Sequence, residues 1–349
     1  MRAGRLNRLT YPDAVSRSAV PVVLVAGYLG SGKTTLLNHL LRRNHGIRIG
    51  VVVNDFGAVD IDSMLVAGQV DSMITLGNGC LCCAVDTEDL DEMFGALTAT
   101  SAAVDAIVVE ASGVAEPRTL IRMVVASTDS RIRYGGMVMV VDALHVLEST
   151  ARHQHLAQHL GLADLVVVNK ADAVGPGRID EVLTLVRDAA PAAPTVVTSH
   201  GAVDVSLLLD PPKRPDDEPR QLALDDLLRE QDDPHDHLHA SYETFSVETS
   251  DCLDPRAFFE FLENPPAGLY RSKGFVRFGR GAARFVVQTV GVHIDVETAS
   301  SRGDTALVFI GSGLDVAAAR SRIEAMVRTE SATDEESLVV HRFLRTGDR

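Results

Sequence analysis

Short apolar runs alternate with helix-length segments along the first two thirds of the chain. Runs rich in Val and Ile occupy residues 21–26, 49–53, 106–109, 137–141, 165–168 and 195–198. Residues 34–43 instead repeat leucines at helical spacing, directly after a glycine-rich stretch. Strands that are buried on both faces have continuous apolar sequences, and most of the intervals are long enough for a crossover helix. The pattern predicts a doubly wound α/β domain with a mostly parallel sheet.

The pattern changes after residue 210. Residues 211–240 are proline-rich and carry nine acidic against four basic side chains, with a cluster of histidines at His235, His237 and His239. This composition predicts a linker. Beyond it we expect a smaller α+β domain, with strands at 242–248, 268–278, 284–290 and 305–310 and helices at 255–262 and 314–327. The predicted division is a disordered tail over 1–20, a first domain over 21–210, a linker over 211–240, a second domain over 241–328 and a loose tail over 329–349.

Composition narrows the class of protein. Of the 349 residues, 46% are hydrophobic and 23% charged, and no apolar run approaches the ~18 residues of a membrane-spanning helix. The formal charge of −15 argues against nucleic acid as a partner, because that binding relies on clustered Lys and Arg. The first 20 residues lack the apolar segment of a secretory signal. We therefore expect a cytoplasmic protein that binds neither membranes nor nucleic acid.

A Walker A motif joins the first predicted strand to the first helix: Gly27-Tyr28-Leu29-Gly30-Ser31-Gly32-Lys33-Thr34. In this motif the backbone N–H groups and the helix N-terminus bind phosphate, the lysine reaches the β- and γ-phosphate oxygens, and the Thr hydroxyl is a ligand of Mg²⁺. The chain has only four lysines, and Lys33 is one of them. The predicted phosphate-binding residues are Gly27, Gly30, Ser31, Gly32, Lys33, Thr34 and Thr35.

The run at 106–109 leads into Glu110-Ala111-Ser112-Gly113, which has the form of a Walker B strand followed by a switch II glycine. An acid at this position holds Mg²⁺ directly or through water and orients the attacking water. The glycine N–H donates to the γ-phosphate. We therefore predict that Lys33, Glu110 and Gly113 are catalytic, and that Thr34 and Glu110 hold Mg²⁺.

The run at 165–168 leads into Asn169-Lys170-Ala171-Asp172, at the sheet edge where ligands of open α/β folds bind. This tetrapeptide resembles the guanine-reading motif of GTPases. There the carboxylate, here Asp172, accepts hydrogen bonds from guanine N1–H and the exocyclic amine, while the lysine stem covers the base. Adenine does not offer that pairing, so Asn169, Lys170 and Asp172 predict GTP as the nucleotide.

Three of the four cysteines lie within one glycine-rich loop, as Cys80-Leu81-Cys82-Cys83. This spacing does not fit a disulfide framework, and thiolates bind Zn²⁺ and other soft or borderline ions. An extended loop would place Cys80 and Cys82 on one face and Cys83 on the other, so further ligands must be recruited. Asp55, in Asn54-Asp55-Phe56-Gly57, is one candidate. Two alternatives stay open: the cysteines are buried structural residues, or they form a redox pair.

The remaining histidines and the fourth cysteine carry less information. The cluster at 235–239 either captures metal or has no role, since imidazole binds Zn, Co and Ni but the segment is acidic and solvated. His153, His155 and His159 recur at helical spacing and are expected on the surface. Cys252 stands alone and is expected to be structural.

Taken in order, these motifs resemble those of the CobW-like family of GTP-dependent metal chaperones. The resemblance rests on residues 27–38, 54–57, 78–83, 110–117 and 169–172, and on Arg271-Ser272-Lys273-Gly274-Phe275 in the second domain. It covers roughly residues 22–327. It implies a P-loop GTPase domain and a CobW-type C-terminal domain. It also implies slow GTP hydrolysis with Mg²⁺, and delivery of Zn²⁺ or Co²⁺ through Cys80, Cys82, Cys83 and Asp55 to a client metalloprotein or a cobalamin-pathway enzyme.

One position departs from the family pattern, and two other functions remain possible. The family usually has glutamate where this chain has Asp55, and a shorter carboxylate alters the reach to metal. A metal store or sensor with negligible turnover is one alternative. An assembly factor whose cysteines are redox-active or structural is the other. The sequence does not determine the metal, the client or the oligomeric state.

Overall fold

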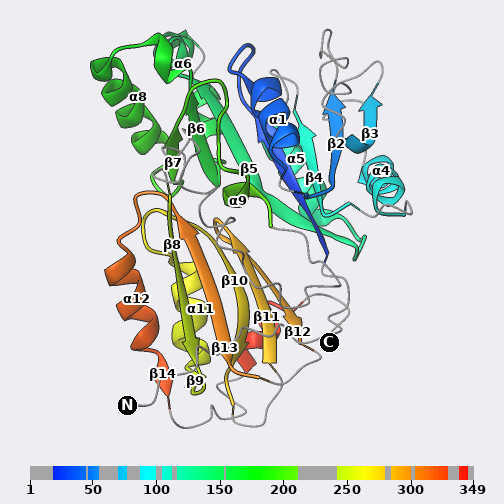
Figure 1. The fold of residues 1–349 in the computed structure, drawn as a ribbon, viewed down its shortest axis with the longest axis vertical. Coiled ribbons are helices and arrows are strands. Elements are labelled where there is room, and N and C mark those ends of the chain that lie inside the picture. Colours follow the sequence, from blue (N-terminus) through cyan, green and yellow to red (C-terminus); the bar gives the residue numbers. More distant parts are fainter. Residues whose placement is uncertain are drawn as a thin grey trace, which may run out of the picture.

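The computed structural model describes residues 19–44, 46–54, 70–76, 87–99, 104–111, 116–152, 155–210, 242–279, 284–299, 303–328 and 338–344. These residues form a seven-stranded sheet with its helices and, beneath it in Figure 1, a five-stranded sheet with two further helices. The predicted linker and the first 18 residues lie outside the described residues.

The larger sheet has the strand order β3-β2-β4-β1-β5-β6-β7. All its neighbours pair in parallel. Its strands are β1 Val20–Ala26, β2 Ile49–Asn54, β3 Val70–Leu76, β4 Ala106–Glu110, β5 Ile132–Asp142, β6 Leu165–Asn169 and β7 Thr195–Val197. This sheet confirms the predicted doubly wound α/β fold. Because the strands are parallel, the segments that follow β1, β4, β5, β6 and β7 all leave from one edge.

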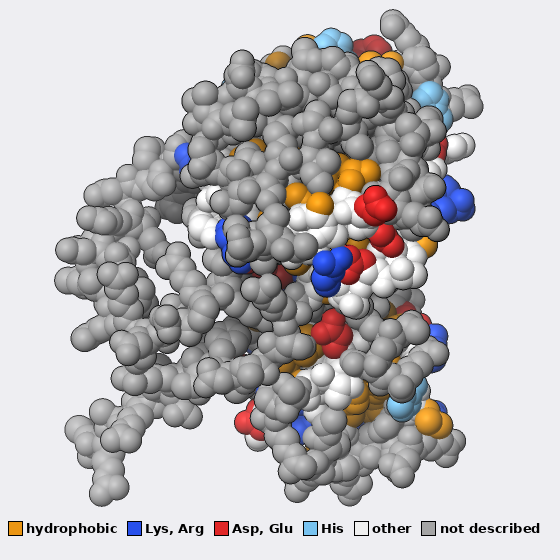
Figure 2. Space-filling view, turned by 90° about the vertical axis from the view of Figure 1, so that its right-hand side faces the viewer, with side chains coloured by type: hydrophobic (Ala, Val, Ile, Leu, Met, Phe, Trp, Pro, Cys, Tyr) orange, Lys and Arg blue, Asp and Glu red, His pale blue; other side chains and the backbone are white. Residues whose placement is uncertain are grey.

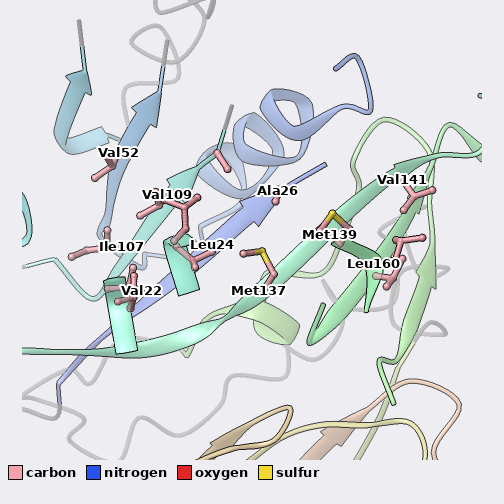
Figure 3. Packing of buried hydrophobic residues seen from close by; sticks show 14 of the residues in the cluster. Val22, Leu24, Ala26, Val52, Ile107, Val109, Met137, Met139, Val141 and Leu160 are labelled. Carbon is pink, nitrogen blue, oxygen red and sulfur yellow. The ribbon is translucent and has the colours of Figure 1, made fainter. Parts of the chain in front are cut away.

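Helices cover both faces of this sheet, because alternate residues of each strand point to opposite faces. Helices α1 Lys33–Arg42 and α9 Val205–Leu208 share a core with Val23 and Val25 of β1. The opposite face packs against α4 Thr87–Ala99, α5 Pro117–Ala126, α6 Val146–Arg152, α7 His155–Leu160 and α8 Pro176–Ala189. Figure 3 shows Val22 and Leu24 of β1 beside Val109 and Met137 of the neighbouring strands in that second core.

The smaller sheet is antiparallel, with the order β12-β11-β10-β13-β8. Its strands are β8 Glu243–Thr249, β10 Leu269–Arg277, β11 Arg284–Val290, β12 His293–Thr298 and β13 Thr305–Gly311. Helices α11 Pro255–Glu263 and α12 Val316–Glu324 pack on one face, and the short strands β9 Cys252–Leu253 and β14 Val327–Arg328 pair beside them. The predicted second α+β domain is confirmed. Cys252 is fully buried in β9, as expected for a structural residue.

Residues 338–344 differ from the prediction of a loose tail over 329–349. The chain beyond residue 328 was expected to be loose, yet this segment packs against α11. Val340 and Leu344 are buried, and the ring of Phe343 stacks on that of Phe259 with centroids 4.5 Å apart. The expectation failed because three apolar side chains in a short segment can complete a core without any periodic pattern that the sequence reveals.

The surface and the helices add two observations. On the side of the molecule shown in Figure 2, acidic and basic side chains of described residues lie next to one another among apolar and neutral groups. None of the helices that the structure describes combines the length and the apolar stretch needed to cross a membrane.

Candidate functional site

The Walker A loop connects β1 to α1 at the carboxyl edge of the larger sheet. The N-cap of α1 is Gly32, with φ of 102°, a left-handed conformation that favours glycine. A Cβ at Gly32 would lie 2.2 Å from Nδ2 of Asn169, so the close approach also excludes a side chain. Leu36 N–H bonds to the Gly32 carbonyl, and the N–H groups of a helix's first turn have no partner within the helix, so those at the start of α1 can bind an anion. The seven predicted phosphate-binding residues therefore belong to one loop and one helix N-terminus.

Lys33 lies folded into this loop. Its Nζ donates to the carbonyl oxygens of Gly27 at 3.0 Å and Tyr28 at 3.3 Å, and the residue is 7% exposed. Burial lowers the pKa of Lys33, and the nearby charge of Glu110 opposes that shift. A phosphate entering the loop would offer a stronger acceptor than two neutral carbonyl oxygens, because charge-assisted hydrogen bonds are stronger than neutral ones.

Glu110 and Thr34 meet across two neighbouring elements. Glu110 ends β4, directly beside β1, and is buried. Thr34 Oγ1 donates to Glu110 Oε1 at 2.9 Å. A hydroxyl and a carboxylate oxygen at this spacing are hard donors of the kind that Mg²⁺ prefers, so the two residues fit that ion. Gly113, predicted to act with them, lies outside the described residues.

Asn169 connects two loops. Its Nδ2 donates to the Ser31 carbonyl at 3.0 Å, and its Oδ1 accepts from the Gly201 N–H at 2.9 Å. Both polar ends of the buried amide are used, so its role in this structure is to hold the Walker A loop against the loop after β7. That Asn169 also binds the nucleotide stays a prediction, because the amide nitrogen carries two N–H donors and only one is used here.

Lys170 and Asp172 follow β6, at the same edge of the sheet as the Walker A loop. Lys170 adopts φ of 62°, and its Nζ pairs with Asp142 Oδ2 at 2.8 Å. Asp142, at the end of β5, also accepts from the His145 ring at 2.9 Å. Burial works to raise the pKa of Asp142, but the bonds from Lys170 and His145 outweigh it and lower that pKa. Asp172 is half exposed, with 49% of its side chain open to solvent and available to a ligand.

The loop of residues 198–201 completes this corner of the site, and the sequence did not predict it. Ala171 N–H donates to the Thr198 carbonyl at 3.1 Å, and Asp172 N–H donates to Ser199 Oγ at 3.1 Å. His200 Nε2 lies 3.6 Å from Asp172 Oδ2. The available signal was weak: a strand that ends at the same edge as the motifs, followed by polar residues and a glycine. We call residues 198–201 the base-side loop.

A cavity of about 290 Å³ lies beside the Walker A loop, on the face covered by α5, α6 and α7. Most of its lining is apolar, and Tyr28, Met139, His145 and His159 contribute to it. His159 Nε2 lies 3.3 Å from Glu116 Oε2, whereas His155 is exposed, as expected. His153 lies outside the described residues.

The predicted metal ligands Asp55, Cys80, Cys82 and Cys83, and the histidines at 235–239, also lie outside the described residues. Within the part of the chain that is described, no three His, Cys, Asp or Glu side chains converge as a metal site would require. These residues therefore stay predictions of the sequence.

Residues 21–197, more than half of the chain, match the family described as CobW/HypB/UreG, nucleotide-binding domain. The chain belongs to the CobW/HypB/UreG family. Residues 242–327 match the cobalamin synthesis protein CobW C-terminal domain, so the five-stranded sheet is the C-terminal domain of a CobW-type chain. The resemblance expected from the motifs is confirmed.

Relatives within the CobW/HypB/UreG family carry names that refer to zinc. The chain is 29% identical over 351 residues to the zinc chaperone CobW of a Sinorhizobium species, covering 89% of this chain and 98% of that one. It is 32% identical over 197 residues to the zinc chaperone YjiA of Escherichia coli, covering 55% and 61% of the two chains. The crystal structure of Zn(II)-bound YjiA GTPase from E. coli aligns with a TM-score of 0.44 at 21% identity, over 89% of this chain and 99% of that one.

Proposed function

We propose that this protein is a GTP-dependent zinc chaperone that binds Zn²⁺, or Co²⁺, through its cysteine loop and transfers it to a client metalloprotein. The observation that carries the proposal is the combination of two facts. One edge of the larger sheet gathers Lys33, Glu110 and Asp172, and the chain matches a protein named a zinc chaperone along nearly its whole length.

The phosphate side of the proposed site is the Walker A loop. Backbone N–H groups at the start of α1 would bind the β-phosphate, and Lys33 would exchange its two carbonyl partners for phosphate oxygens. Thr34 and Glu110 would hold Mg²⁺, which when bound neutralises charge on the β- and γ-phosphates. Glu110, which accepts from the Thr34 hydroxyl, would also orient the attacking water.

The base side of the proposed site selects guanine. Asp172 offers an exposed carboxylate whose backbone is fixed by the base-side loop. The stem of Lys170 would lie over the base while its ammonium stays on Asp142. A carboxylate that accepts from guanine N1–H and the amino group discriminates against adenine, because adenine leaves it without donors.

The cargo of the proposed chaperone is Zn²⁺ or Co²⁺, held by Cys80, Cys82 and Cys83 with Asp55 as an additional ligand. Their positions in the chain support nucleotide control. Asp55 follows β2 directly, and the cysteine loop begins after β3, so both leave the same sheet edge as the nucleotide motifs. Segments that γ-phosphate orders relax on hydrolysis, and metal would then be released to a docked client.

Two measurements test this function on the full-length reduced protein. The first is GTP turnover with and without Zn²⁺, with ATP as the competing nucleotide. The second is a competition titration for Zn²⁺ and Co²⁺ in the presence of GDP and then of a non-hydrolysable GTP analogue. We expect slow turnover, preference for GTP, and metal affinity that is about 5–150-fold higher with the GTP analogue.

Each outcome has a distinct meaning. Metal affinity that is equal in the two nucleotide states removes the release mechanism. Metal binding without turnover identifies a store or sensor instead of a chaperone. Absence of stoichiometric metal on the reduced protein leaves an assembly factor whose cysteines have another role.

A further inference from the structure

Arg271, in strand β10 of the C-terminal domain, reaches into the nucleotide-binding domain. Its side chain is 3% exposed. Nη1 donates to the Leu208 carbonyl at 3.0 Å, and Nη2 donates to Asp210 Oδ2 at 2.7 Å. The planar guanidinium thus holds two acceptors on one short segment, a geometry that a single ammonium cannot reproduce. This contact gives a role to the first residue of the Arg271–Phe275 motif.

Asp210 is the centre of a group of cations from both domains. Arg133 of β5 lies 3.5 Å from its Oδ2, and Lys273 pairs with its Oδ1. Burial works to raise the pKa of Asp210, but the charges of Arg271, Lys273 and Arg133 outweigh it and hold that pKa well below its ordinary value. Asp210 therefore stays ionised, and the end of the segment is fixed in place.

The segment that Arg271 holds begins at the base-side loop. Nine residues separate His200 from Asp210, and several of them have fixed contacts. The Gly201 N–H donates to Asn169, and a Cβ at Gly201 would lie 2.7 Å from the backbone nitrogen of Leu36 in α1. The four residues of α9 follow, with Leu207 and Leu208 fully buried. The segment between Asp210 and the base-side loop therefore has little freedom to move.

Other contacts between the domains fall on the same part of the sheet. Ser312 Oγ donates to the carbonyl of Thr195, the first residue of β7. The backbone of Gly291 packs on the carboxylate of Asp164, which precedes β6. Val290 and Tyr270 pack against Gly136 of β5. Strands β5, β6 and β7 each meet the C-terminal domain near their amino ends, and they lead into Asp142, Asn169 and the base-side loop.

We propose that Arg271 is a positioning residue for guanine recognition. Through Leu208 and Asp210 it holds the base-side loop, and so Asp172, in the geometry that accepts the base. The C-terminal domain thereby contributes to nucleotide affinity without contacting nucleotide. This inference rests on the proposed GTP-binding function, because it concerns the base of that nucleotide.

The test compares Arg271→Met with Arg277→Met. Arg277 lies on the same strand and the same face, but its partners Ser250 and Asp304 belong to the C-terminal domain. For Arg271→Met we expect KM for GTP to rise about 3–30-fold with kcat changed less than about twofold, and the preference for GTP over ATP to fall by the same factor. Arg271→Lys, which keeps the charge beside Asp210, should recover part of the loss. Arg277→Met should match the wild-type protein in all three quantities.

A second measurement uses the wild-type protein and needs no variant. Saturating GTP should slow amide hydrogen exchange in residues 208–210 and 269–273, because coupling between two sites is reciprocal. Unchanged exchange there, or a KM for Arg271→Met equal to that of Arg277→Met, overturns the inference. A wild-type protein with no preference for GTP over ATP refutes the proposed function itself, which separates the two failures.

Discussion

At the scale of single residues, the structure shows the partners of each motif residue. Lys33 donates to two carbonyl oxygens of its own loop, and the carboxylate of Asp172 is half exposed. The side-chain amide of Asn169 bonds to the Ser31 carbonyl and to the Gly201 N–H, and Lys170 is paired with Asp142. A sequence motif reports that these residues occur together. It does not report which of them touch the nucleotide.

Replacing Lys33 with alanine should reduce kcat/KM for GTP about 10²–10³-fold, the usual effect of removing one charged or polar contact to the developing charge. The fold should survive, because the lysine bonds only to two carbonyl oxygens of its own loop. Steady-state hydrolysis and circular dichroism measure the two effects. Arg43→Ala, an exposed cation just after α1, is the control, and turnover equal to that control would refute the Walker A assignment.

Replacing Asp172 with alanine should remove the preference for GTP. Hydrogen bonds to a charged group contribute about 1.5–3 kcal/mol, so GTP affinity should fall at least about 10-fold while ATP affinity stays constant. Competition between the two nucleotides for a fluorescent analogue measures this. Asp180→Ala removes an exposed carboxylate from α8 and serves as control. If Asp172→Ala retains the wild-type ratio, the base is read elsewhere.

At the scale of elements, the sequence predicted strands well where they are buried on both faces. The runs that became β1, β4 and β6 are nearly all Val, Ile and Leu. Four strands were not predicted: the two-residue strands β9 and β14, and the longer strands β3 and β12, for which there is a physical reason. β3 carries Asp71, Ser72 and Thr75, and β12 alternates polar and apolar residues as an edge strand does. Edge strands are solvated on one side, so their composition resembles that of loops.

Only those parts of the candidate nucleotide site that are continuous motifs could be predicted from the sequence. The Walker A loop, Glu110 and the segment of residues 169–172 were identified because each follows a buried strand. Asp142 and the base-side loop were not, because their contacts with Lys170 and Asp172 arise from the packing of β5 and β7 on either side of β6. The partners of Asp210 include Arg271 and Lys273 of the second domain, so the residues next to Asp210 in the sequence do not indicate its role.

The base-side loop yields a prediction that contrasts two glycines. Gly201 has φ of 65°, and a Cβ there would lie 2.7 Å from Leu36 N, so Gly201→Ala should cost about 2 kcal/mol or more and raise KM for GTP. Gly177, in the first turn of α8, has open space around it, so Gly177→Ala should stabilise by about 0.4–1 kcal/mol. Urea denaturation of both variants measures the contrast. Equal effects would contradict the described geometry of the loop.

At the scale of the whole molecule, the two sheets share one core as well as ion pairs. Tyr270 and Val290 of the C-terminal domain pack with residues of β1, β5 and α9, and Tyr134 of β5 lies 4.3 Å from the ring of His293 between centroids. The contacts involve β1, β5, β6 and β7 of the larger sheet. Strands β2 and β3, which lead toward the predicted metal ligands, lie at the far end of the sheet order. The predicted metal ligands thus follow strands that are remote, in the sheet order, from the domain interface.

The ion pairs of Asp210 with Arg133, Arg271 and Lys273 should make the free energy of unfolding depend on pH. The pKa of Asp210 is depressed in the folded protein, so its stabilising effect is complete above the ordinary value of about 3.9 and is lost as pH falls below it. Asp210→Asn should cost on the order of 2–3 kcal/mol at pH 7. That difference should stay constant down to about pH 5 and narrow below pH 4 by up to about 1.4 kcal/mol per pH unit.

Denaturant titrations of the wild-type protein and Asp210→Asn across that range measure the difference. Asp304→Asn, which alters a more exposed carboxylate of the C-terminal domain, should show almost none. A difference that does not change between pH 5 and pH 3.5 would mean that the shape of the side chain matters, and not its charge.

Both ends of the segment between the two sheets attach to the same short helix. Asp210 follows α9, and the hydroxyl of Tyr242, the residue before β8, lies 2.9 Å from Ser206 Oγ on that helix. The segment between Asp210 and Tyr242 therefore begins and ends beside α9. The contacts described above between the two sheets involve residues outside this segment. A change in the length of this segment should therefore leave the contacts between the two sheets unaltered. A protease that cuts it should leave two fragments that migrate as a single species and still bind nucleotide.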